Sequence, residues 1–382
     1  MKPTYLLRLF LIPALLLSSS RVYAIVGFED HAFPEVVTSA RALALGNTYM
    51  SKVDDSWAAF YNPAGLGTVR GLQFHLLNAS FEINDGLNNA ARDGSVSAGE
   101  SLTNLSSSQS AAGLRELLAD VPGTTTHSRV QSFPNITFRG FSLGYMYSLQ
   151  NKARLQDEDD ADLEIAQRTD QGPVASLSVS LFGGVIKFGA SAVQLTRKQL
   201  QKDFAPTDDL EVEDTDYTYG TMTLLTAGAR ITLPIWGLPT LSYVARNSAG
   251  TKFSGESDDF GGLPPDIPAT FDAGVSLTPM LGKNFRVHIE AGMKDIGDAY
   301  GMPSSRRVGA GIEFDYMRSF FVRFGYGDGW GSGGLGVRSR SFVFDLTTYA
   351  IEQTVLDEEG EIDTSVKRKQ DRRFMLSFAR GF

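Results

Sequence analysis

The chain has 382 residues, with 35 lysines and arginines against 44 aspartates and glutamates, and a formal net charge of −9. An acidic chain argues against nucleic acid as a partner, because phosphates bind basic surfaces. The chain has no cysteine, which excludes disulfides, thiolate metal sites, a cysteine nucleophile and a lipoprotein anchor.

The N-terminal residues have the pattern of a signal peptide. Basic residues precede an apolar run at 11–17, and Val22 and Ala24 are small residues at positions −3 and −1 of a cleavage site. The run is too short for a membrane anchor. We predict that residues 1–24 are removed on export.

Residues 25–71 contain a turn of defined shape. Pro63 fixes φ and Gly65 permits unusual dihedral angles, so the segment 62–65 predicts a turn. Asp54 and Asp55 precede a short run that they can cap as a helical turn. From the residue pattern alone, two interpretations remain open: a small plug inside a barrel, or a periplasmic turn that leads into the first strand.

The same segment carries a family resemblance. It reads Ala-Arg-Ala at 40–42, Asp54-Asp55, and Ala-Ala-Phe-Tyr-Asn-Pro-Ala-Gly-Leu at 58–66. This pattern resembles the N-terminus of the FadL/PorV superfamily of outer-membrane β-barrels. The superfamily includes FadL-type long-chain fatty-acid transporters and PorV-type proteins of the type IX secretion system. Two later segments, 241–253 and 321–336, look like strands of this family.

The resemblance implies a hatch at residues 25–71. In FadL-type barrels, a motif that matches Asn-Pro-Ala at 62–64 lies in the plug. The implied hatch and ligand-gating residues are Asp54, Asp55, Asn62, Pro63, Ala64 and Gly65.

Beyond residue 71, apolar and polar side chains alternate over several segments. In 285–294, for example, apolar residues at odd positions oppose Arg286, His288 and Glu290. This is the apolar-out, polar-in pattern of transmembrane strands. A soluble antiparallel sheet gives the same alternation, but the charges and glycines on the polar side favour a barrel. The predicted lumenal polar network is Arg230, Arg246, Arg286, His288, Glu290, Arg323 and Arg338, and we expect Asp54 and Asp55 to meet one or more of these arginines.

No run of eighteen apolar residues follows the signal segment, so a membrane location requires a closed barrel. Long polar loops and tight turns alternate along the chain, as expected when the turns are periplasmic and the loops extracellular. We therefore predict an all-β fold, a transmembrane antiparallel barrel of about 14 strands at residues 72–382 with a small N-terminal hatch. The predicted strands are 72–82, 133–139, 141–150, 165–182, 185–198, 218–233, 240–249, 269–278, 284–294, 306–314, 318–326, 332–339, 341–351 and 370–382.

The last strand ends on an aromatic residue. Phe374, Leu376, Phe378 and Phe382 share one face. The segment resembles the closing strand of outer-membrane barrels, and we predict that it is the insertion signal read by the barrel-assembly machinery.

Other motifs point to no enzyme, cofactor or metal site. The glycine pattern at 331–336 matches G-x-G-x-x-G, but a strand follows it where a phosphate site needs a helix. No G-x-S-x-G elbow is present. The acidic runs 157–162 and 208–214 match no EF-hand loop. They are interpreted as solvated loops, with divalent-ion bridging to lipopolysaccharide as the alternative.

Leucines at roughly helical spacing within 101–120 predict a helix in the first long loop. Such a helix forms an apolar landing groove for a ligand, or packs over the barrel mouth.

The leading functional hypothesis is passive transport of a fatty-acid-like hydrophobic molecule across the outer membrane, with lipids around the barrel. The alternative is a PorV-like scaffold that binds exported proteins or a secretion-system partner. A general porin is less well supported, because a hatch would block an aqueous pore.

Overall fold

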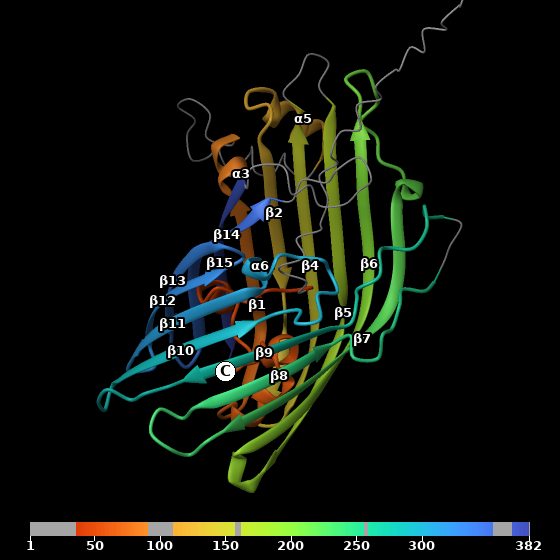
Figure 1. Ribbon diagram of the computed structural model, residues 1–382. Helices are drawn as coiled ribbons and strands as arrows, with labels where there is room; N and C mark the ends of the chain where they lie inside the picture. Colours follow the sequence, from red (N-terminus) through yellow and green to blue (C-terminus); the bar gives the residue numbers. More distant parts are fainter. Residues whose placement is uncertain (1–35, 91–109, 157–161, 256–258, 354–368, 382) are drawn as a thin grey trace, which may run out of the picture.

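The computed structural model describes residues 36–90, 110–156, 162–255, 259–353 and 369–381, and its strands close into a barrel (Figure 1). The signal-peptide prediction lies outside the described residues. The strands are β1 (Gln73–Asn84), β2 (Thr125–Ser132), β3 (Asn135–Phe138), β4 (Phe141–Leu155), β5 (Leu163–Leu181), β6 (Ile186–Phe204), β7 (Tyr217–Thr232), β8 (Thr240–Arg246), β9 (Thr270–Leu277), β10 (Phe285–Met293), β11 (Val308–Tyr316), β12 (Phe320–Gly327), β13 (Trp330–Arg338), β14 (Phe342–Gln353) and β15 (Lys369–Gly381).

Every strand pairs antiparallel with its neighbours, and β15 closes the sheet on β1. The fifteen segments fill fourteen positions, because β2 and β3 both lie between β1 and β4. Pro134 separates these two segments and has no N–H to donate to the ladder. The Phe133 amide still bonds to Asn78, and the Tyr145 amide to Pro134. The predicted antiparallel barrel of 14 strands is confirmed.

Several strand boundaries differ from the prediction; for example, β4 ends at Leu155 instead of residue 150, and β6 ends at Phe204 instead of residue 198. The second strand begins at Thr125 instead of residue 133, because hydrophilic side chains at His127 and Arg129 face inward there. Strand β13 begins at Trp330 instead of residue 332, and β12 joins it through a two-residue turn at Asp328 and Gly329. Both turn residues have positive φ, 51° and 82°, which suits the twist of a tight hairpin.

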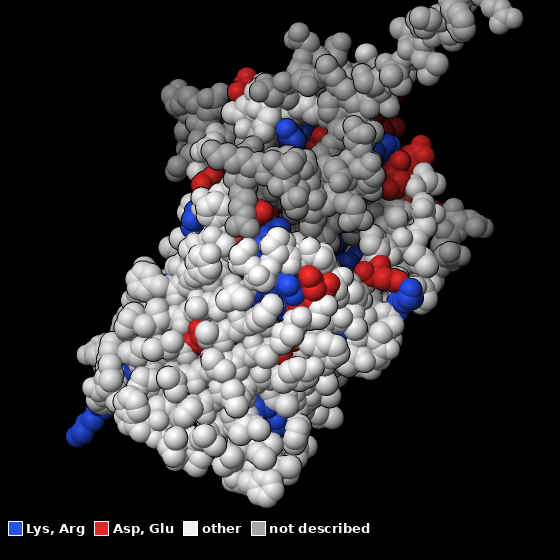
Figure 2. All heavy atoms as spheres, viewed as in Figure 1, with Lys and Arg blue, Asp and Glu red and all other residues white. Residues whose placement is uncertain are grey.

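The outer surface is apolar. Along β10, for example, the side chain of Ile289 is 44% exposed, while that of the next residue, Glu290, is 1% exposed. Figure 2 shows a mostly uncharged surface below the loops, with charged side chains gathered toward the loop end. A closed barrel with an outward apolar band spans a membrane. Among the described residues, no helix is long and apolar enough to cross a membrane.

Residues 36–69 fold inside the barrel as three short helices (Figure 1). These are α1 (Ala40–Ala44), α2 (Ala58–Tyr61) and the 3-10 helix η1 (Pro63–Thr68). Val36 lies near loop residues Ile267 and Pro268, whereas Leu66 bonds to the turn residue Gly140. The segment therefore runs through the lumen from the loop end to the turn end, where β1 begins. We call residues 36–69 the inner segment.

The remaining helices of the described residues belong to loops and turns. The loop helix α5 (Ala111–Ala119) buries Leu114 and Leu118 against Leu163, Ile165 and Leu200. By strand alternation these three face outward, so α5 covers the outside of the loop-end extension of β5 and β6. The prediction of a loop helix falls partly on residues 101–109, outside the described ranges. The others are α3 (Asp85–Ala90), α6 (Ser304–Arg307), η2 (Phe182–Gly184) and η3 (Asp214–Asp216).

Candidate functional site: the occupied lumen

Glycines on the inner face of β11, β12 and β13 let the inner segment approach the wall directly. A Cβ built on Gly325 would lie 2.1 Å from the amide nitrogen of Gly46, and one on Gly311 would lie 2.6 Å from the Leu45 carbonyl oxygen. On β13, a Cβ at Gly334 would lie 2.8 Å from that of Ala44. No larger residue fits at these contacts without displacing backbone, so this side of the lumen holds the segment by shape. Three further glycines line the same surface: Gly309, Gly327 and Gly336.

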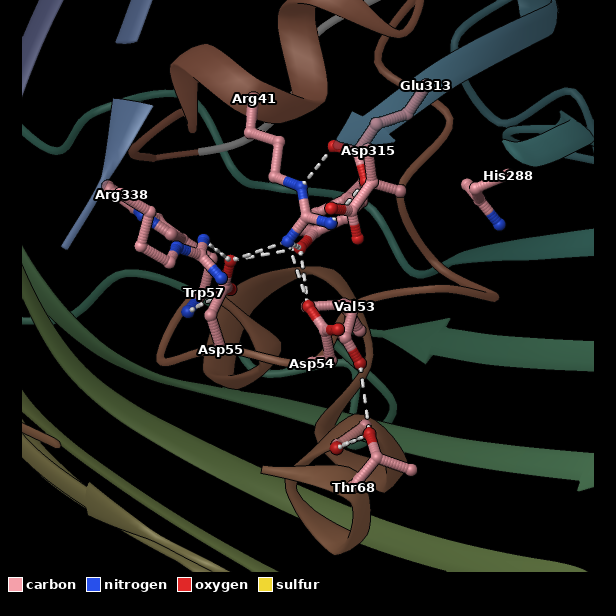
Figure 3. Close-up of polar contacts among 12 residues, drawn as sticks. Arg41, Val53, Asp54, Asp55, Trp57, Thr68, His288, Glu313, Asp315 and Arg338 are labelled. Atoms are coloured by element: carbon pink, nitrogen blue, oxygen red, sulfur yellow. Dashed lines mark hydrogen bonds and ion pairs between the residues drawn. The ribbon is translucent and has the colours of Figure 1, made fainter. Parts of the chain in front are cut away.

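A buried ion-pair chain joins the inner segment to the same wall (Figure 3). Arg41 of α1 donates two hydrogen bonds of 2.7 Å to the carboxylate of Glu313 on β11. Glu313 also accepts a 2.8 Å bond from Arg323, which bonds in turn to Asp345 at 2.5 Å. A paired arginine and carboxylate with two parallel bonds is both strong and directional. Removing one member would leave buried charge without its partner, a costly defect.

Arg41 also organises the inner segment itself. Its guanidinium donates to Asp54 at 2.8 Å and to the Tyr49 hydroxyl at 2.5 Å, and Tyr49 donates to Asp55 at 2.9 Å. Burial favours the neutral form of Asp54, but the positive charges of Arg41, Lys52 and Arg338 together outweigh burial and hold the pKa of this carboxyl below its usual value. Asp54 and Asp55 therefore meet an arginine of their own segment. Among the lumenal arginines named from the sequence, Arg338 lies 3.9 Å from Asp55.

The turn at 62–65 forms a second anchorage. Asn62 caps η1 by accepting from the Ala64 amide at 3.0 Å, and it donates to the Met50 carbonyl at 3.0 Å. Pro63 is the first residue of η1, as its fixed φ allows. The reason for a glycine at position 65 differs from the expected one. Its φ is not positive; a Cβ there would lie 2.5 Å from the Val53 side chain.

The strands around this turn again present glycines. A Cβ at Gly228 of β7 would lie 2.1 Å from the Asn62 side-chain oxygen, and one at Gly189 of β6 would lie 2.3 Å from Pro63.

The predicted helix cap at Asp54 and Asp55 differs in detail. Asp55 accepts a hydrogen bond from the Trp57 amide at 3.1 Å, one residue before α2 begins, so it supports a turn without capping the helix directly.

The structure places all seven predicted lumenal polar residues on the inner face. Three of them bond to the inner segment. Arg230 donates to the Val53 carbonyl, Arg246 to the Phe60 carbonyl at 3.0 Å, and Glu290 accepts from the Ser51 amide at 2.5 Å. Arg338 lies 3.9 Å from Asp55 of the inner segment, and the other three pair within the wall: Arg286 with Asp315, His288 with Glu290, and Arg323 with Glu313.

The opposite side of the lumen contains an apolar patch, which the sequence interpretation missed; polar side chains such as Asp170 and Arg197 share the same face. Strands β4 to β7 turn a set of apolar side chains inward, onto the face of the inner segment that carries Trp57 and Phe60. We call this set the apolar wall. The sequence does contain a signal for it: on the inner face of β6, the apolar residue Val193 follows Gly189 and Ser191, where a small or polar residue would be expected. The apolar wall consists of Met146, Val174, Val193, Leu195, Met222 and Leu224.

Three aromatic rings lie beside the apolar wall. Phe133, between β2 and β3, packs edge-on against Phe60 at a centroid distance of 4.9 Å, and Trp57 lies 5.8 Å from Phe133. All three side chains are buried. We call Trp57, Phe60 and Phe133 the aromatic cluster.

Cavities adjoin the aromatic cluster on both sides. Toward the loops, a space of about 30 Å³ is lined by Phe60, Val193, Leu224 and Ile267. Toward the turns, a cavity of about 230 Å³ is lined by Trp57 together with polar residues that include Arg70 and Arg338. The aromatic cluster thus lies between an apolar recess and a polar vestibule.

The structure also gives the positions of the other residues and motifs named from the sequence. Phe374 and Leu376 face outward on β15, at 38% and 40% exposure, while Phe382 lies outside the described residues. The glycine pattern at 331–336 lies within β13, with no helix after it. Residues 157–161 are not described, whereas Asp214 pairs with Lys198 at 2.8 Å. Within the described ranges, no group of three or more acidic or histidine side chains could hold a metal ion.

A closed antiparallel barrel with an apolar exterior and a buried inner segment defines a plugged, membrane-spanning barrel. No protein-family model matches the chain, and no curated protein matches it. Among solved structures it is similar to the CymD monoaromatic hydrocarbon channel, with 11% identity, a TM-score of 0.48, and coverage of 90% of this chain and 99% of that chain.

Two further structures are similar to it. The P. putida toluene transporter TodX has 10% identity and a TM-score of 0.46, over 90% of this chain and 98% of that chain. A Pseudomonas aeruginosa FadL homologue has 10% identity and a TM-score of 0.28, over 94% of this chain and all of that chain.

Proposed function

We propose that the chain is an outer-membrane channel through which small hydrophobic molecules diffuse, with residues 36–69 acting as a plug that stays in place. The observation that carries this proposal is the apolar wall. These side chains surround the aromatic cluster, whereas the facing strands β11 to β13 meet the inner segment mainly through glycines and ion pairs. An apolar solute that covers about 100 Å² of its surface against such a wall gains about 2.5 kcal/mol.

The proposed path runs beside the plug. A solute would leave the loops at the recess by Ile267, pass the aromatic cluster and reach the vestibule lined by Arg70 and Arg338. The recess of about 30 Å³ is far smaller than the roughly 150 Å³ of cavities that admit benzene. Passage therefore requires the rings of Phe60, Trp57 or Phe133 to rotate. Passage along this path is diffusion and requires no nucleotide hydrolysis.

Two classes of solute fit the proposed path, and they differ in whether they carry a charged head group. A fatty-acid-like molecule would bury its chain against the apolar wall and bring its carboxylate to the arginines of the vestibule. A monoaromatic hydrocarbon, the class of solute after which the similar CymD channel is named, would use the apolar wall alone. Parallel uptake of toluene and a fatty acid separates these two.

The test uses one pair of isosteric substitutions with opposite signs. Val193→Thr adds a hydroxyl to the apolar wall, and Thr226→Val removes one from the lining of the recess. We expect Val193→Thr to lower the uptake of toluene or fatty acid into proteoliposomes several-fold, and Thr226→Val to leave it unchanged or raise it. Equal uptake by both variants and the parent, with folding verified by heat-modifiable gel migration, would contradict the proposal.

The second candidate function is a PorV-like scaffold. The dense anchorage of the plug on the glycines and on Glu313 favours it, because a scaffold requires a closed barrel. Under this alternative, purification in mild detergent yields a stoichiometric protein partner, and neither substitution changes solute uptake.

A further inference from the structure

The rim at the turn end of the barrel is chemically divided. Three consecutive turns, between β5 and β6, β7 and β8, and β9 and β10, carry large apolar side chains at their tips. Trp236 is 77% exposed, Phe182 is 76% exposed, and Leu281 is 60% exposed. Turns that project into water are usually polar, built from Gly, Pro, Asn, Asp and Ser. We call these three turns the apolar rim; their exposed apolar residues are Phe182, Leu233, Ile235, Trp236, Leu238, Met280 and Leu281.

The other half of the rim is more polar, although Leu72 and Met317 are exposed there as well. The turn after β3 carries the exposed Arg139, and the turn between β13 and β14 reads Ser339, Arg340 and Ser341, all exposed. The vestibule of about 230 Å³ opens on this half, since Arg340 and Ser341 line it. One side of the same barrel end therefore suits hydrocarbon and the other suits water.

Strand length gives an independent reason to place the apolar rim in the membrane. Strand β8 has 7 residues and β9 has 8. At about 3.4 Å per residue and a tilt of about 40°, seven residues rise only about 18 Å. The apolar band of such barrels is about 25 Å tall. The neighbouring turns at 233–239 and 278–284 would complete the band with their apolar tips at hydrocarbon depth, and the exposed Lys283 can extend its charged end toward the headgroups.

An apolar groove joins the apolar rim to the lipid-facing surface. It has a volume of about 440 Å³ and lies on the outside of the barrel, between Leu233 and Pro239 of the rim and Leu241, Val275 and Ile289 of the strands. These strand side chains alternate outward with the rest of the apolar band, so the groove continues the lipid-facing surface without a polar break.

We infer that the apolar rim is immersed in the periplasmic leaflet, with a phospholipid acyl chain in the groove. The barrel is then seated unevenly: the turns after β5, β7 and β9 lie in hydrocarbon, while Arg139, Arg340 and the vestibule face periplasmic water. Trp236 at the tip suits this position, since tryptophan gathers where membrane meets water. This inference rests on the membrane-spanning barrel and is independent of what the channel carries.

The test reads the depth of Trp236. The chain has three tryptophans, so Trp57→Phe with Trp330→Phe leaves Trp236 as the sole emitter. The matched control adds Trp236→Phe and Ser341→Trp, which moves the emitter to the polar half of the rim. In vesicles of acyl-brominated phospholipid, we expect Trp236 to be quenched several-fold more than the tryptophan at 341. Aqueous acrylamide should give the reverse order.

A second measurement guards against altered folding in the tryptophan variants. The parent has no cysteine, so Ile235→Cys and Ser341→Cys each provide one thiol in the full chain. A membrane-impermeant maleimide present on the turn side of vesicles should label position 341 and spare position 235. Equal labelling, or strong acrylamide quenching of Trp236 without lipid quenching, would overturn the inference and leave the apolar rim as a surface for a protein partner.

Discussion

The two sides of the lumen differ in how they contact the same inner segment. On β11 to β13, glycines and the chain of Arg41, Glu313, Arg323 and Asp345 hold the segment by backbone contact and buried charge. On β4 to β7, the apolar wall meets Phe60 and Trp57 through side chains, and glycine contacts with the plug lie nearer the turn end, at Gly189 and Gly228. Backbone contacts and paired charges tolerate little movement, whereas aromatic and aliphatic side chains can change rotamer. The comparison teaches that β11 to β13 fix α1 and its neighbours, while β4 to β7 fix the plug mainly around the turn 62–65 and leave a path beside the aromatic cluster that can open.

The largest effect should come from breaking the charged side. Arg41→Met leaves the Glu313 carboxylate buried with one partner fewer, and loss of one member of a buried pair costs about 3–5 kcal/mol. We expect the plug to loosen and single-channel conductance in planar bilayers to rise.

The control for this change also neutralises Glu313, while Asp54 still lacks the Arg41 guanidinium. The double variant Arg41→Met with Glu313→Gln should recover part of the parent behaviour, because Arg323 keeps Asp345. Parent-like conductance in the single variant would mean that Arg41 does not hold the plug.

A smaller effect is expected from filling the glycine contact. Gly325→Ala puts a methyl group 2.1 Å from the backbone of Gly46, and overpacking of this kind costs about 1–3 kcal/mol. Thermal unfolding in detergent should shift downward. Gly333→Ala is the matched control, since its nearest contact would be an ordinary 3.4 Å; an equal shift in both would show that glycine loss in a strand, and not contact with the plug, is responsible.

The same substitution on the two sides sharpens the comparison furthest. Phe133→Leu trims a ring of the aromatic cluster, and Phe321→Leu trims the ring that stacks near Arg41 at 5.8 Å. We expect Phe133→Leu to raise toluene uptake up to several-fold with little change in conductance to ions. Phe321→Leu should lower stability by about 1 kcal/mol and leave uptake unchanged. If Phe321→Leu raised toluene uptake and Phe133→Leu did not, the path would lie on the side of β11 to β13, and the proposed path would be wrong.

Much of the barrel could be predicted from the sequence, because apolar and polar side chains alternate along each strand with a period of two. A register error of one residue would turn every apolar side chain of a strand from the lipid to the lumen, so the pattern is strongly determined. The second strand was predicted too short because its inward residues, among them His127 and Arg129, are polar and its outward residues include Ser128, which weakens the alternation. The break at Pro134 added to this effect.

The lumen was harder to predict for a physical reason. Contacts such as that of Arg41 with Glu313 join residues 272 positions apart, and local pattern carries no information on such pairs. The inward face of Arg230, Arg246 and Glu290 followed from alternation, but their partners are backbone groups of the plug, which no residue type reveals. The apolar wall was missed because Met146 and Val193 look like core residues of any strand until the register assigns them to the lumen.

The central claim is that solutes pass while the plug stays in place. The cysteine-free chain allows a direct test, since Ala44→Cys with Gly334→Cys places two Cβ atoms about 2.8 Å apart, close enough to form a disulfide after a small shift. This bridge would tie α1 to β13. Toluene uptake should then be equal in the oxidised and reduced forms of the variant. Uptake that is lost on oxidation and restored by reduction would show that the plug must move, and would contradict the account.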